Sequence, residues 1–226
     1  MRTSALHDLH WARVPDTAGW TLIAGMRLPA QFPNEADPGT LALADASHRT
    51  RVGVKGPGAA AHLAALGLPI PPQPNRWASL SNGGLIARLG LTEFFVEDDG
   101  AIRSQIAAPM AAGVYGVPRA DTALVLAGQG ANEVLLQTCS VNFNAMERSS
   151  GELALTFIAG VAVLIIPQYT GDLPLYRIWC DPSYGPYLYR TLLGIVEELG
   201  GGPVGISGLD RLAPTPSDPT PTTRDP

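Results

Sequence analysis

The amino-acid sequence predicts an α+β fold in which a few helices cover mainly antiparallel sheets. Segments with the alternating pattern of strands outnumber helical segments, which is typical of this class. The 226 residues include 25 Gly and 21 Pro, and this composition favours many turns over long helices. One pattern of strand, Gly-x-Gly and helix occurs twice, which predicts two similar α/β sub-domains related by duplication.

The repeated pattern lies at residues 51–66 and again at residues 123–136, 72 residues later. In each copy an alternating strand ends at a glycine, Gly56 or Gly128, and a helix begins directly after the Gly-x-Gly turn. Glycine accepts a sharp backbone turn, and small residues let the helix pack close to the strand. Neither copy has the third glycine of a dinucleotide-binding motif. We therefore expect Gly56 and Gly128 to be structural.

The other elements follow from local patterns. Two short strands separated by Gly90-Leu91-Thr92 predict a β-hairpin, and three further apolar stretches read as strands. Apolar residues at helical spacing, closed by three glycines, predict one long helix near the C-terminal end. The hairpin strands are 85–89 and 93–97, the further strands are 153–157, 161–166 and 175–180, and the helix is 184–199.

The two ends of the chain look different from its middle. Residues 1–40 hold many turn signals and the scattered aromatics Trp11, Trp20 and Phe32, and we expect an arm that either caps the chain's own core or wraps a partner. Pro, Thr, Ser and Asp dominate the end of the chain, so residues 203–226 are predicted to be a disordered tail. The sub-domains between them are predicted at 41–112 and 113–202.

Composition excludes some classes of function. The net charge is −5 and the 15 basic residues form no run, which argues against nucleic-acid binding. Charged residues make up 15% of the chain against roughly 25% in a typical domain, which favours a surface partly covered by a partner, although a loop-rich composition has the same effect. No signal peptide or membrane span is evident, and Cys139 and Cys180 suit neither a zinc site nor a redox pair. We expect a cytoplasmic protein.

Candidate catalytic and metal-binding groups are few. His7 and His10 have H-x-x-H spacing, but no third ligand is in view, so we expect no metal site. Asp45, Ser47 and His48 are the residue types of a catalytic triad, but such close neighbours are more typical of a turn before the next strand. We therefore predict no catalytic residue.

Several motifs resemble the glycine-cleavage T-protein superfamily, also known as the aminomethyltransferase folate-binding superfamily. LADAS at 43–47 with VGVKGPGA at 52–59 is similar to the opening of that superfamily, and LGLTEF at 89–94 resembles its hairpin. Further stretches resemble the gamma subunit of heterotetrameric sarcosine oxidase: LPIPPQPNR at 68–76, CSVNF at 139–143 and DPSYGPYL at 181–188. The resemblance covers roughly residues 41–200 and implies two pseudo-repeated T-protein-like sub-domains.

The departures from the family concern its folate site. T-proteins carry an acidic pair after a Gly-Gly turn, and one of its carboxylates engages the pterin; by the resemblance these positions fall on Val163 and Leu164 here. A donor-rich ring edge needs a carboxylate, which neither residue supplies. Asn142 stands where the family has Asp. The resemblance therefore implies the fold and not folate chemistry, and for any pocket that persists, Asn142, Tyr169 and Arg177 are our candidates for its polar lining.

The function that the resemblance implies is an accessory, non-redox subunit of a complex that oxidatively demethylates a small N-methylated amine such as sarcosine, dimethylamine or methylglutamate. Flavin, iron–sulfur or haem chemistry is expected on larger catalytic subunits, and no cofactor on this chain alone. The alternatives are a tetrahydrofolate-dependent one-carbon transfer protein and a regulatory folate sensor. Because aromatics are usual interface anchors, Trp11, Trp20 and Phe32 are expected to contact the partner.

Overall fold

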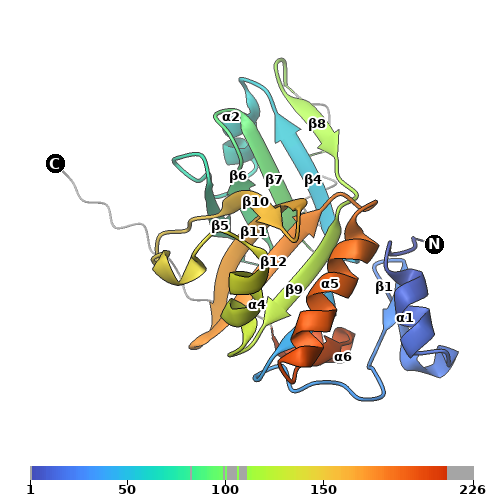
Figure 1. Cartoon of the computed structure of the whole chain (residues 1–226). Helices are drawn as coiled ribbons and strands as arrows, with labels where there is room; N and C mark the ends of the chain where they lie inside the picture. The colour runs from blue at the N-terminus through green and yellow to red at the C-terminus, as the bar shows by residue number, and fades with distance from the viewer. Residues whose placement is uncertain (1, 82, 99, 101–105, 107–110, 213–226) are drawn as a thin grey trace.

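A computed structural model describes residues 2–81, 83–98, 100, 106 and 111–212 of the chain. Its larger sheet has six strands in the order β10, β11, β12, β9, β3 and β13 (Figure 1). Every neighbouring pair in this sheet is antiparallel except β13 with β3. The strands are β10 (Ala154–Ile158), β11 (Val161–Thr170), β12 (Leu173–Cys180), β9 (Thr122–Ala127), β3 (Ala42–Asp45) and β13 (Gly202–Val204).

The second sheet has five antiparallel strands, and helices complete the fold. Its strands, in spatial order, are β5 (Arg76–Ser79), β6 (Leu85–Arg88), β7 (Glu93–Asp98), β4 (Thr50–Lys55) and β8 (Tyr115–Pro118). A separate hairpin consists of β1 (Trp20–Ile23) and β2 (Met26–Pro29). The helices are α1 (His7–Arg13), α2 (Ala59–Ala65), α4 (Ala131–Thr138), α5 (Gly185–Glu198) and α6 (Ile206–Arg211). The α+β class with mainly antiparallel sheets is confirmed.

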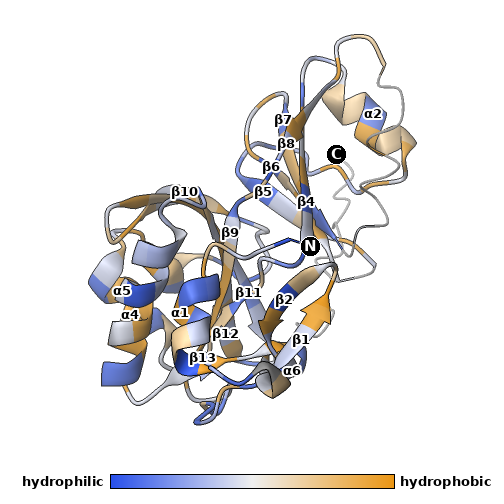
Figure 2. Cartoon of the chain, turned by 90° about the vertical axis from the view of Figure 1, so that its right-hand side faces the viewer, coloured by the Kyte–Doolittle hydropathy of each residue, from blue (hydrophilic) through white to orange (hydrophobic). Residues whose placement is uncertain are grey.

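The elements form layers. Figure 2 shows α1, α4 and α5 on one side of the six-stranded sheet, and the β1–β2 hairpin with α6 on the other side. Because side chains alternate along a strand, Tyr176 and Ile178 of β12 pack towards the helices, whereas Leu175 and Trp179 face the other side. Phe95 of β7 meets Trp179 there with ring centroids 5.1 Å apart. The layer between the two sheets is therefore a shared core.

The long helix and the glycine turns agree with the sequence. The helix predicted at 184–199 is α5, and its buried face follows helical spacing through Leu188, Leu192 and Val196. The structural role of Gly56 and Gly128 is confirmed, since their φ angles are +117° and +107°. A Cβ at Gly128 would lie 2.6 Å from the carbonyl oxygen of Thr40, so the backbones approach too closely for a side chain.

Strand pairing crosses the predicted boundary between the sub-domains. Strand β3 was expected in the sub-domain at 41–112, but it pairs with β9 of the other unit. Strand β8 was expected in the sub-domain at 113–202, but it pairs with β4. The two units thus exchange a strand. Which strands pair depends on long-range packing, and a local sequence pattern does not contain that information.

The N-terminal arm and the first part of the predicted tail both pack on the rest of the chain. The arm at 1–40 contains α1 and the β1–β2 hairpin, and it buries Leu6 in the chain's own core. The tail predicted from residue 203 is ordered to residue 212, because β13 pairs with β3 and α6 buries Leu209. Residues 213–226 of the predicted tail lie outside the described residues. None of the helices in the described ranges is long and apolar enough to cross a membrane.

Candidate functional site

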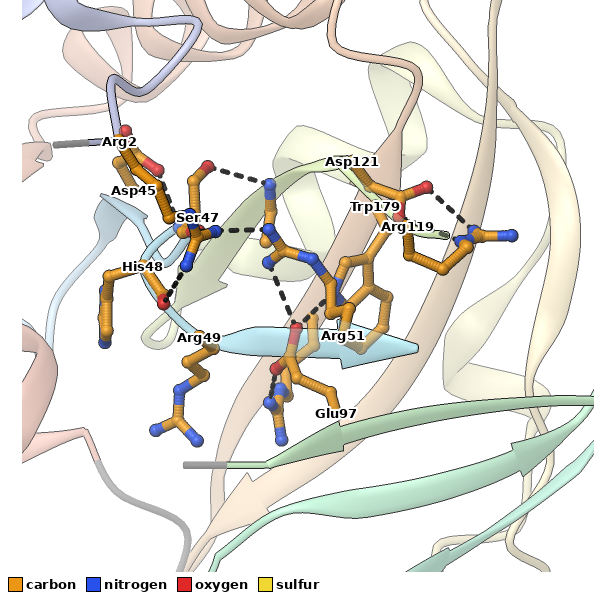
Figure 3. A network of polar contacts seen from close by, with 12 residues as sticks. Arg2, Asp45, Ser47, His48, Arg49, Arg51, Glu97, Arg119, Asp121 and Trp179 are labelled. Atoms are coloured by element: carbon orange, nitrogen blue, oxygen red, sulfur yellow. Dashed lines mark hydrogen bonds and ion pairs between the residues drawn. The ribbon is translucent and has the colours of Figure 1, made fainter. Parts of the chain in front are cut away.

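A buried carboxylate joins the two sheets. Glu97 on β7 is 0% exposed. Its Oε2 accepts hydrogen bonds from Nη1 of Arg51 on β4, at 3.4 Å, and from Nε1 of Trp179 on β12, at 2.6 Å (Figure 3). Its Oε1 accepts a hydrogen bond from Nη2 of Arg177, also on β12. Strand alternation brings these side chains together, because each occupies the face of its strand that looks toward the other sheet.

The network places two buried arginines around one buried carboxylate. Arg51 and Arg177 are both buried. Burial lowers the pKa of Arg177, and the positive charges of Arg49 and Arg51 lower it further. A guanidinium nevertheless keeps its proton in proteins, so two buried cations share the carboxylate of Glu97, and the charges of Asp121 and Asp45 also act on Arg51. Removing one partner of a buried ion pair costs about 3–5 kcal/mol. The network therefore fixes how the two sheets pack.

Ser47 connects this network to the N-terminal segment. Its carbonyl oxygen accepts hydrogen bonds from Nη2 of Arg51, at 3.0 Å, and from Nη2 of Arg2, at 3.3 Å (Figure 3). Its hydroxyl oxygen accepts a hydrogen bond of 3.1 Å from the amide of Ala123 on β9. The turn at Ser47 thus contacts β4, β9 and the beginning of the chain.

Asp45 at the end of β3 anchors helix α1. Its Oδ2 accepts a hydrogen bond from Oγ of Ser4, at 2.6 Å, and lies 3.0 Å from Nε2 of His10. Its Oδ1 accepts a hydrogen bond of 2.8 Å from the amide of Ser47. Burial by itself would raise the pKa of Asp45, but the contacts with His10, Ser4 and Ser47 outweigh it and hold the pKa below its usual value. The carboxylate of Asp45 is therefore ionised, and its contacts link α1 to the sheet.

Asp45, Ser47 and His48 do not form a triad. The hydroxyl of Ser47 is engaged with Ala123, and Asp45 pairs with His10 instead of His48. Ser47 lies in the turn between β3 and β4, as predicted, whereas Asp45, which was expected in the same turn, is the last residue of β3. Burial, followed by the positive charge of Arg49, lowers the pKa of His48 to about 4. His48 is consequently a buried neutral side chain at neutral pH.

A pocket of about 480 Å³ opens beside the network and shares Trp179 with it. Leu89 and Glu93 line it from the β6–β7 hairpin, and Leu155 and Phe157 line it from β10. The pocket thus lies between the two sheets, and its volume is in the usual range for ligand sites, roughly 300–1,000 Å³. Most of its wall is apolar and aromatic, which suits the burial of an apolar group.

The polar groups of the pocket favour binding over proton transfer. Arg119 donates two hydrogen bonds to Asp121, of 2.9 and 2.8 Å, so these charges neutralise each other. Burial, followed by the nearby charges of Asp121 and Asp181, raises the pKa of the Cys180 thiol to about 12. Because the thiolate is the nucleophilic form of cysteine, Cys180 is poorly suited to covalent chemistry.

The three residues predicted to line one pocket do not meet. Arg177 is buried in the network between the sheets. Tyr169 lines a separate polar pocket of about 370 Å³ near the β11–β12 turn, where the guanidinium of Arg148 lies 4.1 Å from the centre of its ring. Asn142 caps the short helix Phe143–Ala145 by accepting a hydrogen bond of 3.2 Å from the amide of Asn144. The three residues thus have different surroundings, and a ligand-binding role for each of them stays a prediction.

The aromatic residues of the N-terminal arm pack mainly on their own chain. Phe32 is 5% exposed and meets the ring of His10 edge-on, with ring centroids 5.7 Å apart. Phe32 is therefore a core residue of this chain, and its side chain is not exposed as an interface anchor. Trp20 donates a hydrogen bond of 2.8 Å to the carbonyl of Val14. Trp11 is 42% exposed and packs against Trp20 at 5.8 Å. A partner contact at Trp11 and Trp20 stays a prediction.

Sequence reasoning missed Glu97, Arg51 and Trp179, although a signal was present. Each lies in a strand-like segment, and strand alternation places Glu97 on the same face as the buried Phe95, and Trp179 on the same face as the buried Leu175. A charge on a buried face requires a partner, so Glu97 was a candidate for an ion pair. Identifying Arg51 as a partner requires the strand order, since the two residues are 46 positions apart in the sequence.

Comparison with known proteins gives matches to solved structures. The chain matches no protein-family model and no curated protein. Aminomethyltransferase T of the glycine cleavage system from Bartonella henselae has a TM-score of 0.71 and 20% identity over 94% of this chain, which spans 62% of that protein. A chain of heterotetrameric sarcosine oxidase from Corynebacterium sp. U-96 has a TM-score of 0.65 and 19% identity, covering 89% of this chain and 97% of that one. The T-protein-like fold expected from the motifs is therefore confirmed.

Proposed function

We propose that this chain is an accessory, non-redox subunit of a cytoplasmic multi-subunit enzyme that oxidatively demethylates a small N-methylated amine. The observation that carries the proposal is the fold shared with a chain of a heterotetrameric sarcosine oxidase, over 97% of that chain's length. The motifs at 68–76, 139–143 and 181–188 resemble the same class of complex and support it independently. Flavin, iron–sulfur or haem chemistry is assigned to the partner subunits.

The network between the sheets is consistent with a supporting role. Glu97 accepts hydrogen bonds from three donors, and two of them, on Arg177 and Trp179 of β12, hold one sheet to the other. Asp45 likewise holds α1 and the turn at Ser47. These carboxylates are engaged by donors of the chain itself. The charged groups therefore stabilise a rigid body, and the pocket beside Trp179 is left for binding.

The purified complex tests this proposal. The chain is tagged in its native host, the particle that carries it is purified, and formaldehyde release is measured from sarcosine, dimethylamine and methylglutamate. We expect one of these amines to be demethylated by the particle and none by the isolated chain. A particle without demethylase activity, or full activity in a particle lacking this chain, would overturn the proposal.

A tetrahydrofolate-dependent one-carbon transfer protein is the second candidate, because the fold is also that of an aminomethyltransferase over 94% of this chain. Val163 and Leu164, which the motif resemblance places at the acidic pair, are both buried and apolar. Each pterin donor left unpaired would cost about 1–3 kcal/mol. Calorimetry of the isolated chain with tetrahydrofolate separates the candidates: the subunit proposal expects no micromolar binding, and a micromolar Kd would favour the carrier.

A further inference from the structure

Strand β10 exposes a large apolar surface at the end of the six-stranded sheet. Leu155 is 55% exposed and Phe157 is 63% exposed. In the β10–β11 ladder these residues stand opposite Leu164 and Ala162, so all four side chains share one face. We call these four residues the β10 face. Adjacent large apolar side chains left in water are unusual for an uncovered surface and often mark an interaction site.

The β10 face continues into the pocket described above. All four of its residues also line the pocket of about 480 Å³, together with Trp179 and Leu89. An apolar side chain from another molecule could therefore cover Phe157 and insert between the two sheets. This arrangement of a cavity beside an exposed apolar rim is typical of the position where an interface anchor binds.

The backbone of β10 is also available for pairing. Among the described residues no strand pairs with its outer side along its length; only Cys139 forms an isolated bridge with Ile158 at one end. The hairpin that follows has two turn residues, Ala159 and Gly160, with φ angles of +49° and +81°. Such two-residue turns close on a hydrogen-bonded pair, so the amide of Leu155 points to the open edge. An extended segment can add to this edge and place alternate side chains on the β10 face.

Charge on the rim of the pocket selects the partner. Glu93 and Asp181 are exposed carboxylates on this rim, whereas Asp121 is neutralised by Arg119. A second copy of the chain would bring the same two carboxylates, and its net charge of −5, to the same surface. Like charges placed together across an interface are unfavourable, and opposite charges guide association. The rim therefore disfavours self-association and favours a basic segment.

From these observations we propose that the β10 face and its pocket bind an extended segment of a partner subunit that carries alternating apolar residues and at least one Lys or Arg. The inference rests on the proposed function and names the surface through which this chain joins the complex. The apolar residues cover Leu155 and Phe157, one of them enters the pocket beside Trp179, and the basic residue pairs with Glu93 or Asp181.

Photocrosslinking in the native complex tests this surface. Phe157→p-benzoylphenylalanine is introduced into the tagged chain, the cells are irradiated, and the attached peptide is identified by mass spectrometry. The matched control is Leu22→p-benzoylphenylalanine on β1, where the native residue is 64% exposed. We expect position 157 to crosslink to one segment of a larger subunit with the stated composition, and position 22 to give no such product.

The outcomes separate the inference from the proposed function. If the particle is a hetero-oligomer but position 157 gives no crosslink, crosslinks to a second copy, or labels no better than position 22, the inference fails and the proposed function stands. If the native particle is a single chain, both fail.

A charge reversal gives a second measurement. Glu93→Arg is expected to weaken association by roughly tenfold, and Glu198→Arg, on α5 at the other face of the sheet, is expected to leave it unchanged. Equal weakening by both variants would contradict recognition at the rim.

Discussion

The indole N–H of Trp179 donates a hydrogen bond of 2.6 Å to the carboxylate of Glu97, and this contact joins β12 of one sheet to β7 of the other. The same carboxylate binds Arg51 and Arg177, so one buried anion holds two buried cations. The four residues come from three strands that are distant in the sequence. Their contacts explain why the two sheets behave as a single core.

Substitution of Glu97 should strongly destabilise the chain. Glu97→Gln removes the carboxylate that pairs with both Arg51 and Arg177, and we expect a loss of about 3–5 kcal/mol in the free energy of unfolding. Urea unfolding followed by circular dichroism measures this. Glu198→Gln, on the exposed side of α5, is the control and should change the stability by no more than about 0.5 kcal/mol. Equal effects of the two substitutions would mean that the network contributes little.

Stability should fall in mild acid because of His48. Its pKa is about 4 in the folded chain, against about 6.5 when unfolded. As the pH drops from 7 to 5 the unfolded state takes up a proton that the folded state does not, so the free energy of unfolding decreases. His48→Gln should weaken the pH dependence of the free energy of unfolding. The stability difference between wild type and variant at pH 8, where His48 is neutral in both states, serves as the reference. Parallel loss of stability by wild type and variant between pH 7 and 5 would contradict the assignment.

Gly128 should not tolerate a side chain. At φ +107°, with Thr40 in close approach, a Cβ strains the turn between β9 and α4. We expect Gly128→Ala to lower the free energy of unfolding by at least about 1–3 kcal/mol. Gly194→Ala is the matched control, since Gly194 lies in α5 with open space around it. That substitution should stabilise the helix by about 0.5–1 kcal/mol, and a similar result at Gly128 would refute the close approach.

The N-terminal arm should be required for folding. Leu6 is fully buried in the core that includes α5, and Asp45 holds α1 through His10. Leu6→Ala is expected to cost about 2–5 kcal/mol, and deletion of residues 1–35 should abolish cooperative unfolding. Leu22→Ala, at an exposed position of β1, should be nearly neutral. A truncated chain that unfolds cooperatively with unchanged stability would show that the arm is dispensable.

The sequence predicts the local elements well because their signals are local. Alternation gives β6, β7, β11 and β12, and helical spacing followed by glycines gives α5. The turns at Gly56 and Gly128 follow from the conformational freedom of glycine. Helix α1 was missed, because its seven residues include two histidines and a tryptophan and its only buried residue is His10. Its position is set by Asp45, which lies 35 residues away.

The site could be predicted only in part because it is built from long-range contacts. Arg177 was a candidate for the polar lining of a pocket, and the structure places it in the network between the sheets, where it donates a hydrogen bond to Glu97. The structure places Tyr169 in a different pocket and Asn142 at a helix cap, because the three residues lie on separate elements whose positions a local pattern does not contain. The pocket beside Trp179 needs the packing of one sheet on the other, which no local pattern contains.

Native mass spectrometry of the particle purified from its own host tests whether this chain is a subunit of a larger complex. We expect a mass well above the 23.7 kDa of this chain, with the chain present together with at least one larger, different subunit. Partial dissociation in the instrument should release this chain intact and without a bound cofactor. A native particle that contains this chain alone, as a monomer or as a homo-oligomer, would contradict the claim.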